Sequence, residues 1–305
     1  MRFSEKGIDM ANDNKLGAPE GYTIKKSGPA LRIISTILLV VWSIINLYPL
    51  FWMIMLSLKN NEQVNLTHKF GLPAGWPNKW HWENYTNPEL HLERIVTYFK
   101  NSVIVTVLAI AIALVAAMMA SYAITRIRWR ASEMMNRIFM LGITIPIQAS
   151  IIPVYLVVSK LKLINTPIAL IVPYSAFSLA MALLICNGFM IQIPKELDEA
   201  AYIDGCGRGK VFFSVILPLM KPAVATTAIY TFLQCWNELM FAQTFLTGED
   251  YMTLPAGMAQ LFGSHTTEWG PIGAALVIAT MPTIVFYILF SRRIQDSFIA
   301  GAVKG

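Results

Sequence analysis

Long apolar blocks alternate with polar connectors along this chain. Six blocks are rich in Leu, Ile, Val, Ala and Phe, and the connectors between them carry most of the charges. A helix needs about 20 mostly apolar residues to cross the hydrocarbon core of a membrane, and it satisfies its backbone amides internally. The alternating ten-residue strands of a membrane barrel are absent from the sequence. The pattern therefore predicts six membrane-spanning helices, at residues 31–58, 101–124, 134–158, 166–190, 223–246 and 271–290.

The composition is that of a membrane protein. Hydrophobic residues make up 55% of the 305 residues and charged residues 14%, whereas an ordinary soluble domain carries about 25% charged residues. Residues 1–30 are polar and lack the apolar core of a removable signal peptide, so the first block is expected to remain as an anchor. We expect an all-α, polytopic membrane protein with an N-terminal tail at residues 1–30 and a membrane domain at residues 31–305.

The positive charges predict how the chain is oriented. Lys and Arg accumulate on the cytoplasmic side of membrane proteins. Of the 24 Lys and Arg residues, seventeen fall on one side of the six blocks and seven on the other. The richer side holds both termini and the connectors around Arg128 and Gly205. We therefore expect these parts of the chain in the cytoplasm.

The sequence does not support nucleic-acid binding, a metal site or a disulfide framework. The net charge of +6 comes from scattered residues that form no continuous basic face, so membrane lipid is expected as a partner and nucleic acid is not. The cysteines and histidines have neither the spacing of a metal site nor that of a disulfide framework. These residues are Cys186, Cys206, Cys235, His68, His81, His91 and His265.

The connector at residues 193–222, between the fourth and fifth blocks, is the most informative segment. It is too polar to cross a membrane, yet Pro194 suits a first helical turn, Glu196 and Asp198 complement the positive end of a helix, and Gly205 suits a helix stop. Residues 211–217 can form a second, apolar helix. The segment therefore predicts a helix, a turn and a helix on the cytoplasmic side.

This connector has the features of a docking surface. Ala200 and Ala201 have little bulk, so a partner surface could approach closely, while Glu199 and Asp204 offer charged contacts. Residues 205–211, GCGRGKV, lack the first glycine and the Ser or Thr of a phosphate-binding loop, so no ATP site is expected on this chain.

The same segment resembles the EAA loop of permease subunits of bacterial ABC importers. That pattern is EAA, three residues, Gly, nine residues, Ile, one residue, Leu, Pro, and Val215 stands at the Ile position. The six-span layout, the TRIRWR turn, the CWNE stretch at residues 235–238 and the AGAVKG end are similar to maltose-type permeases. The matching positions of the EAA pattern are Glu199, Ala200, Ala201, Gly205, Leu217 and Pro218.

The resemblance implies a non-catalytic subunit of a sugar or oligosaccharide importer in the bacterial inner membrane. In that family the EAA loop is a coupling helix seated in a groove of the ATPase subunit. The implied partners are two ATP-binding cassette subunits, a second permease subunit that completes a heterodimer, and an external solute-binding protein. ATP and Mg would bind to the ATPase subunits, and this chain would form half of the translocation pathway.

Glu238 is the only acidic residue well inside an apolar block. A carboxylate there is costly in lipid and is a functional candidate. Gln234 and Asn237 add polar groups, and Trp236 could pack on a sugar ring, so these four residues are candidates for the pathway. Glu238 could instead hold an interhelical hydrogen bond that shapes the pore.

Asn187 and Gln192 are weaker candidates for the same path. A competing hypothesis is an ion-coupled secondary transporter in which Glu238 carries a proton, although such a protein has no use for the EAA pattern. A membrane-embedded enzyme is a third possibility, but the sequence offers no nucleophile, base or metal cluster at a usable spacing.

Overall fold

A computed structural model describes residues 29–64, 71–72, 80–86, 92–127, 129–261 and 268–302. Nearly all of the expected tail at residues 1–30 and the last three residues lie outside these ranges. The chain divides into two units, Met1–Phe51 and Trp52–Gly305, and each is described by itself. Helices and turns make up the described residues, with no strand among them, so the predicted all-α class is confirmed.

The first unit contains most of helix α1, Pro29–Ser57. All residues from 29 to 51 are exposed, and the helix is long and apolar enough to cross a membrane, with a mean hydropathy of 2.1 over its best stretch. Pro49 lies inside it without ending it. Because a helix that is apolar on all sides has no reason to face water, its surroundings are lipid or partner helices.

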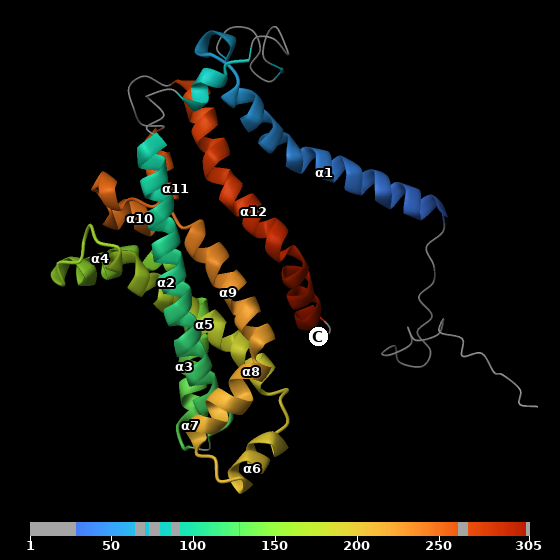
Figure 1. Ribbon diagram of the computed structural model, residues 1–305, viewed down its shortest axis with the longest axis vertical. Coiled ribbons are helices and arrows are strands. Elements are labelled where there is room, and N and C mark those ends of the chain that lie inside the picture. Colours follow the sequence, from blue (N-terminus) through green and yellow to red (C-terminus); the bar gives the residue numbers. More distant parts are fainter. Residues whose placement is uncertain are drawn as a thin grey trace, which may run out of the picture. The chain divides into compact units, whose positions relative to one another are not determined.

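Three helices form the centre of the second unit: α2, Leu92–Thr125, α5, Ile168–Met190, and α9, Lys221–Trp236 (Figure 1). Helix α2 begins nine residues before the predicted span. Helix α5 is the most enclosed, since 56% of its most apolar stretch is buried, compared with 33% for α2. It is therefore the helix around which the others pack.

A row of small residues allows α2 and α5 to approach closely. Ala109, Ala113, Ala117 and Ser121 recur every four residues on one face of α2, and each is at most 1% exposed. Small side chains at this spacing let helix backbones pack tightly in a membrane, where the hydrophobic effect does not drive helices together. The hydroxyl of Ser175 on α5 donates a hydrogen bond of 3.4 Å to the carbonyl oxygen of Ala109 across this contact.

The third predicted span is not one straight helix. It consists of α3, Ser132–Thr144, then the short helix η4, Ile147–Ser150, and α4, Ile151–Lys160, with a bend of 96° between the two halves. Pro146 lies at the break and cannot donate a helical hydrogen bond. Ile145 before it is extended, with φ −83° and ψ 114°, as the proline ring requires.

The fifth predicted span, residues 223–246, is also interrupted. Helix α9 ends at Trp236, and the short helix α10, Met240–Phe245, follows after a break at residues 237–239. At its other end, α9 meets the segment Arg208–Leu219 at an angle of 73°, with the break at Met220. Pro222 fits the first turn of α9, where its missing amide hydrogen costs nothing.

The remaining elements pack against α12, Trp269–Ala302, which contains the sixth predicted span, or against α2. They are η2, Trp82–Tyr85, η6, Glu249–Tyr251, and α11, Leu254–Leu261. By length and composition, four described helices could cross a membrane, or up to six if each bent pair is one span. The multi-pass architecture is thus confirmed, and the count of six remains a prediction.

Candidate functional site

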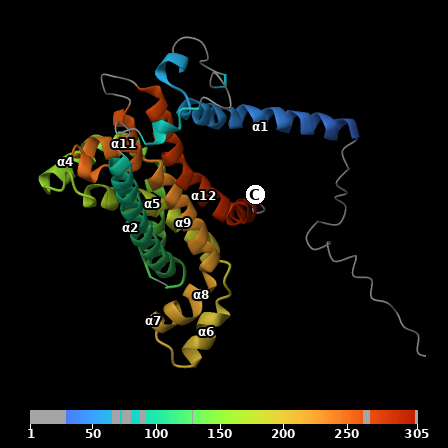
Figure 2. The ribbon, with the colours of Figure 1, turned by 45° about the horizontal axis from the view of Figure 1, so that its top comes forward.

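The connector between α5 and α9 is an ordered unit at one end of the bundle (Figure 2). It contains α6, Glu196–Ile203, α7, Arg208–Val211, a turn of π-helix η5, Phe212–Ile216, and α8, Leu217–Leu219. Gly205 has φ 77°, a left-handed conformation that favours glycine and ends α6. We call residues 193–222 the coupling segment.

The coupling segment buries one face against the bundle. Ala201, Val211, Phe212 and Ile216 belong to a buried cluster that also contains residues of α2, α5 and α9. The ring centroids of Phe212 and Tyr122 on α2 lie 5.0 Å apart. The segment is therefore packed onto the membrane helices and does not hang from them as a flexible loop.

The structure separates the two alanines of the predicted docking surface. Ala200 is exposed, whereas Ala201 is 8% exposed and packs inside the chain. Consecutive residues of a helix point about 100° apart, so a helix lying on a bundle cannot present both. Ala201 is packed against its own bundle, where its small size lets α6 lie close, so Ala200 is the alanine left for a partner, and the docking role of the pair stays a prediction. Of the other predicted coupling residues, Leu217 is half-buried, and the exposed ones are Glu199, Asp204, Gly205 and Pro218.

The coupling segment has exposed apolar side chains that we did not predict from the sequence. Ile203, at the end of α6, is 87% exposed, and Phe213 is 65% exposed. Tyr202 and Leu197 are also exposed. The position of Ile203 was a readable signal, because it is two residues after Ala201 on α6 and therefore lies on the opposite face of that helix. Exposed apolar groups on a polar segment make it a candidate interaction surface.

Arg126, just after α2, ties the coupling segment to two membrane helices. Its guanidinium donates to Asp198 Oδ2 on α6 at 3.1 Å, to the carbonyl oxygen of Met190, the last residue of α5, at 2.6 Å, and to that of Ile193, the first residue of the coupling segment, at 2.5 Å. The side chains of Arg126 and Asp198 are 3% and 10% exposed. A cation suits the negative end of a helix, and burial strengthens each of these bonds.

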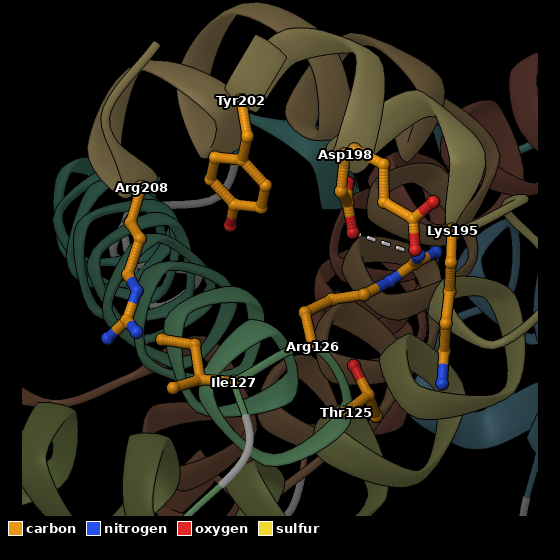
Figure 3. A pocket seen from close by; sticks show the side chains of 8 residues that line it. Thr125, Arg126, Ile127, Lys195, Asp198, Tyr202 and Arg208 are labelled. Atoms are coloured by element: carbon orange, nitrogen blue, oxygen red, sulfur yellow. Dashed lines mark hydrogen bonds and ion pairs between the residues drawn. The ribbon is translucent and has the colours of Figure 1, made fainter. Parts of the chain in front are cut away.

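A cavity of about 580 Å³ lies beside this ion pair (Figure 3). Figure 3 shows Asp198 and Tyr202 of α6 on one side and Arg126 and Ile127 at the end of α2 on the other. Asp198 Oδ1 has no hydrogen-bond partner among the described residues.

Glu238 lies in the break between α9 and α10 and holds it in place. Its carboxylate accepts hydrogen bonds from the hydroxyl of Tyr174 on α5, at 2.5 Å, and from the backbone amides of Phe241 and Ala242, at 3.0 and 3.3 Å. The two amides belong to the first turn of α10, so Glu238 caps that helix. Of the two roles considered for Glu238, the geometry supports the interhelical hydrogen bond that shapes the interior.

The other pathway candidates differ in their exposure. Trp236 is 5% exposed and stacks on Phe232, with ring centroids 5.3 Å apart, so its ring faces are occupied. Asn237 is exposed, and its amide donates to the carbonyl oxygen of Leu233. Gln234 is half-buried, and its Oε1 atom has no partner among the described residues. Of the four, Asn237 has an exposed side chain, and Gln234 has a buried oxygen atom that lacks a partner within the described residues.

The two weaker candidates lie near the inner end of α5. Asn187 is 8% exposed and its amide donates to Asn136 Oδ1 on α3 at 3.0 Å, which makes it an interhelical contact. Gln192 is exposed and bonds back to the carbonyl oxygen of Gly188. Within the described ranges, no group of three His, Cys, Asp or Glu residues could hold a metal ion.

Comparison with known proteins decides the family. The family described as binding-protein-dependent transport system inner membrane component matches residues 109–299, which include the whole coupling segment. This chain belongs to that family. It is therefore a multi-pass inner-membrane component of a transport system, and members of this kind are membrane subunits without a catalytic site of their own.

Relatives that are named as permeases align with most of this chain. The probable ABC transporter permease protein YurM of Bacillus subtilis is 35% identical over 85% of this chain and 84% of its own length. The trehalose/maltose transport system permease protein MalG of Thermococcus litoralis is 36% identical over 90% of this chain and 97% of its own. The diacetylchitobiose uptake system permease protein NgcG of Streptomyces coelicolor is 33% identical over 89% and 88%.

A solved structure has the same fold. A chain of a bacterial ABC transporter involved in the import of the acidic polysaccharide alginate matches with a TM-score of 0.75, at 21% sequence identity. The match covers 89% of this permease and 99% of that chain. The overall arrangement of the helices is therefore one that this solved chain shares.

Proposed function

We propose that this permease forms half of the translocation pathway of an ATP-driven importer for a sugar or oligosaccharide. Three full-length relatives carry names that specify such solutes: trehalose and maltose, diacetylchitobiose, and sulfoquinovosyl glycerol. The observation that carries the proposal is the family match across residues 109–299, together with an ordered coupling segment inside it.

The exposed face of the coupling segment is the proposed contact with the ATPase subunit. Ile203 and Phe213 supply apolar area, and Glu199 and Asp204 supply charge beside them. An apolar anchor surrounded by polar groups is the usual composition of a protein interface. In this proposal, ATP and Mg bind to the ATPase subunit, and this chain contributes no residue to their binding.

The rest of the assembly follows from the same proposal. A second permease subunit completes the pathway as a heterodimer, two ATP-binding cassette subunits drive it, and a solute-binding protein delivers the sugar from outside. Both termini and the coupling segment are cytoplasmic. The excess of Lys and Arg on that side of the six blocks supports this orientation.

Within the pathway, we assign Asn237 and Gln234 to solute contact and Glu238 to the shape of the interior. Their location in and next to the α9–α10 break supports this, because broken helices place polar groups at membrane depth. The ion-coupled alternative is the weaker hypothesis, since the relatives are permeases of ABC importers and Glu238 already caps α10.

The experiment is to co-purify the permease with its ATPase subunit after changing Ile203. Ile203→Glu should abolish co-purification, because it places an uncompensated charge in the proposed apolar contact. Since Ile203 is 87% exposed, the permease itself should keep its thermal stability. Ile203→Leu is the matched control and should retain the ATPase. Normal recovery of the ATPase with Ile203→Glu would show that this face is not the docking surface.

A further inference from the structure

The end of α2 and the residue that follows it supply two side chains, Tyr122 and Arg126, that reach the two halves of the coupling segment. Arg126 binds Asp198 on α6, and the hydroxyl of Tyr122 donates a hydrogen bond of 3.2 Å to the carbonyl oxygen of Arg208, the first residue of α7. Tyr122 and Arg126 are four residues apart and thus lie on one face. The backbone amide of Arg126 still bonds to Tyr122, so both extend from one continuous turn.

These contacts differ from an ordinary surface ion pair. Arg126 makes three hydrogen bonds to two other elements, and its side chain is 3% exposed. By contrast, Arg137 pairs with Glu133 along α3, and both side chains are at least 75% exposed. An exposed pair of that kind contributes little, whereas removing one partner of a buried pair leaves an uncompensated charge.

We propose that Arg126 is a positioning residue that makes the coupling segment move as one body with α2 and α5. The inference rests on the proposed function, because it concerns how the movement imposed by an ATPase reaches the membrane helices. Only arginine has a planar fork that can serve Asp198 and the two carbonyl oxygens at the same time. When α6 is pushed, the ion pair transmits the displacement to the end of α2, and the hydrogen bond to Met190 transmits it to α5.

The geometry favours this role over simple anchoring of the segment. The buried cluster around Ala201 and Phe212 already holds the coupling segment on the bundle by apolar packing. Apolar packing is not directional, whereas a charged hydrogen-bond network fixes one register. The expected loss on removing Arg126 is therefore a loss of coupling in a complex that remains assembled.

The test uses the full complex with a hydrolysis-deficient ATPase subunit, so that Mg-ATP traps one state. Cys206 is replaced by Ser, and Asn237→Cys reports on the interior through its rate of reaction with a membrane-impermeant maleimide. With Arg126 intact, Mg-ATP should change this rate by about tenfold, the usual size of an allosteric effect. In Arg126→Lys and in Asp198→Asn, the change should fall below about twofold. Arg137→Gln, the exposed control, should respond as fully as the parent.

Three outcomes decide the matter. If Arg126→Lys and Asp198→Asn respond like the parent, the inference is wrong. If their response is lost only in proportion to lost co-purification of the ATPase, Arg126 merely stabilises the fold and the inference is equally wrong. Tyr122→Phe removes one hydroxyl and no charge, so we expect this variant to fold. It should partly reduce the change that Mg-ATP causes in the maleimide reaction rate. If the parent itself shows no response to Mg-ATP, the proposed function fails, which is a distinguishable result.

Discussion

The hydroxyl of Tyr174 on α5 donates a 2.5 Å hydrogen bond to Glu238, the residue at which the α9–α10 pair breaks. The same carboxylate accepts two backbone amides of α10. One side chain therefore fixes both the angle of the break and its contact with the central helix. This relationship gives Glu238 a role that needs no proton transfer.

The cap predicts an order of stabilities for variants of these two residues. Glu238→Ala removes all three acceptor contacts and should cost the most, with about 1 kcal/mol from the lost cap and more from the unpaired Tyr174 hydroxyl. Glu238→Gln keeps an acceptor oxygen and should melt closer to the parent in detergent. Uptake should also survive in Glu238→Gln. Loss of uptake in a normally stable Glu238→Gln protein would instead favour the proton-carrier hypothesis.

Gly205 provides a test that separates backbone conformation from side-chain bulk. It has φ 77°, and no atom lies within 4 Å of where a Cβ would be. Gly205→Ala should therefore cost about 1–2 kcal/mol through strain alone, whereas Gly205→Asn should be milder, because Asn tolerates this region.

Gly207 supplies the matched control for this change. It has φ −71° and equally open surroundings, so Gly207→Ala should leave recovery of the ATPase unchanged. Thermal unfolding in detergent measures the loss of stability at each glycine, and co-purification of the ATPase shows whether the coupling segment still docks. Equal effects at the two glycines would contradict the conformational argument.

The sequence predicts the helices better than it predicts their breaks. Helix α5 covers residues 168–190 where 166–190 was expected, because a long apolar block has one stable form in lipid. Proline does not locate the breaks: Pro49, Pro173 and Pro282 lie inside continuous helices, and Pro146 lies at a bend. The break after Trp236 contains no proline and depends on tertiary contacts of Glu238.

The candidate site, too, could be predicted from the sequence only in part. The coupling segment was predicted from its own residues, because caps and a glycine stop are local signals. The Arg126–Asp198 pair joins positions 72 residues apart, and nothing in the spacing of either residue indicates the other. The row of small residues on α2 from Ala109 to Ser121 was readable from its four-residue spacing.

Asn165 has a left-handed backbone conformation, and its side chain hydrogen-bonds to the loop that contains Thr247 and Gly248. Its φ is 59°, and its Oδ1 atom accepts the backbone amides of Thr247 and Gly248 at 2.6 and 2.9 Å. Asn165→Ala loses these bonds and keeps the strained backbone, whereas Asn165→Gly loses the bonds and removes the strain. We expect Asn165→Gly to be the more stable variant by about 1 kcal/mol in thermal unfolding. The reverse order would mean that the backbone at this position is not strained.

Gly273 on α12 marks a close approach of two backbones. A Cβ there would lie 2.6 Å from the backbone nitrogen of Ser57, at the end of α1, and backbone cannot move aside as a flexible side chain can. Gly273→Ala should therefore cost about 1–3 kcal/mol by overpacking. Gly188 on α5 is the control, because a Cβ there meets nothing within 4 Å. Gly188→Ala should be neutral or stabilising by up to about 1 kcal/mol, since Ala favours a helix. Thermal unfolding of both variants in detergent measures the difference, and equal melting temperatures would show that α12 and the end of α1 do not touch as closely as the structure places them.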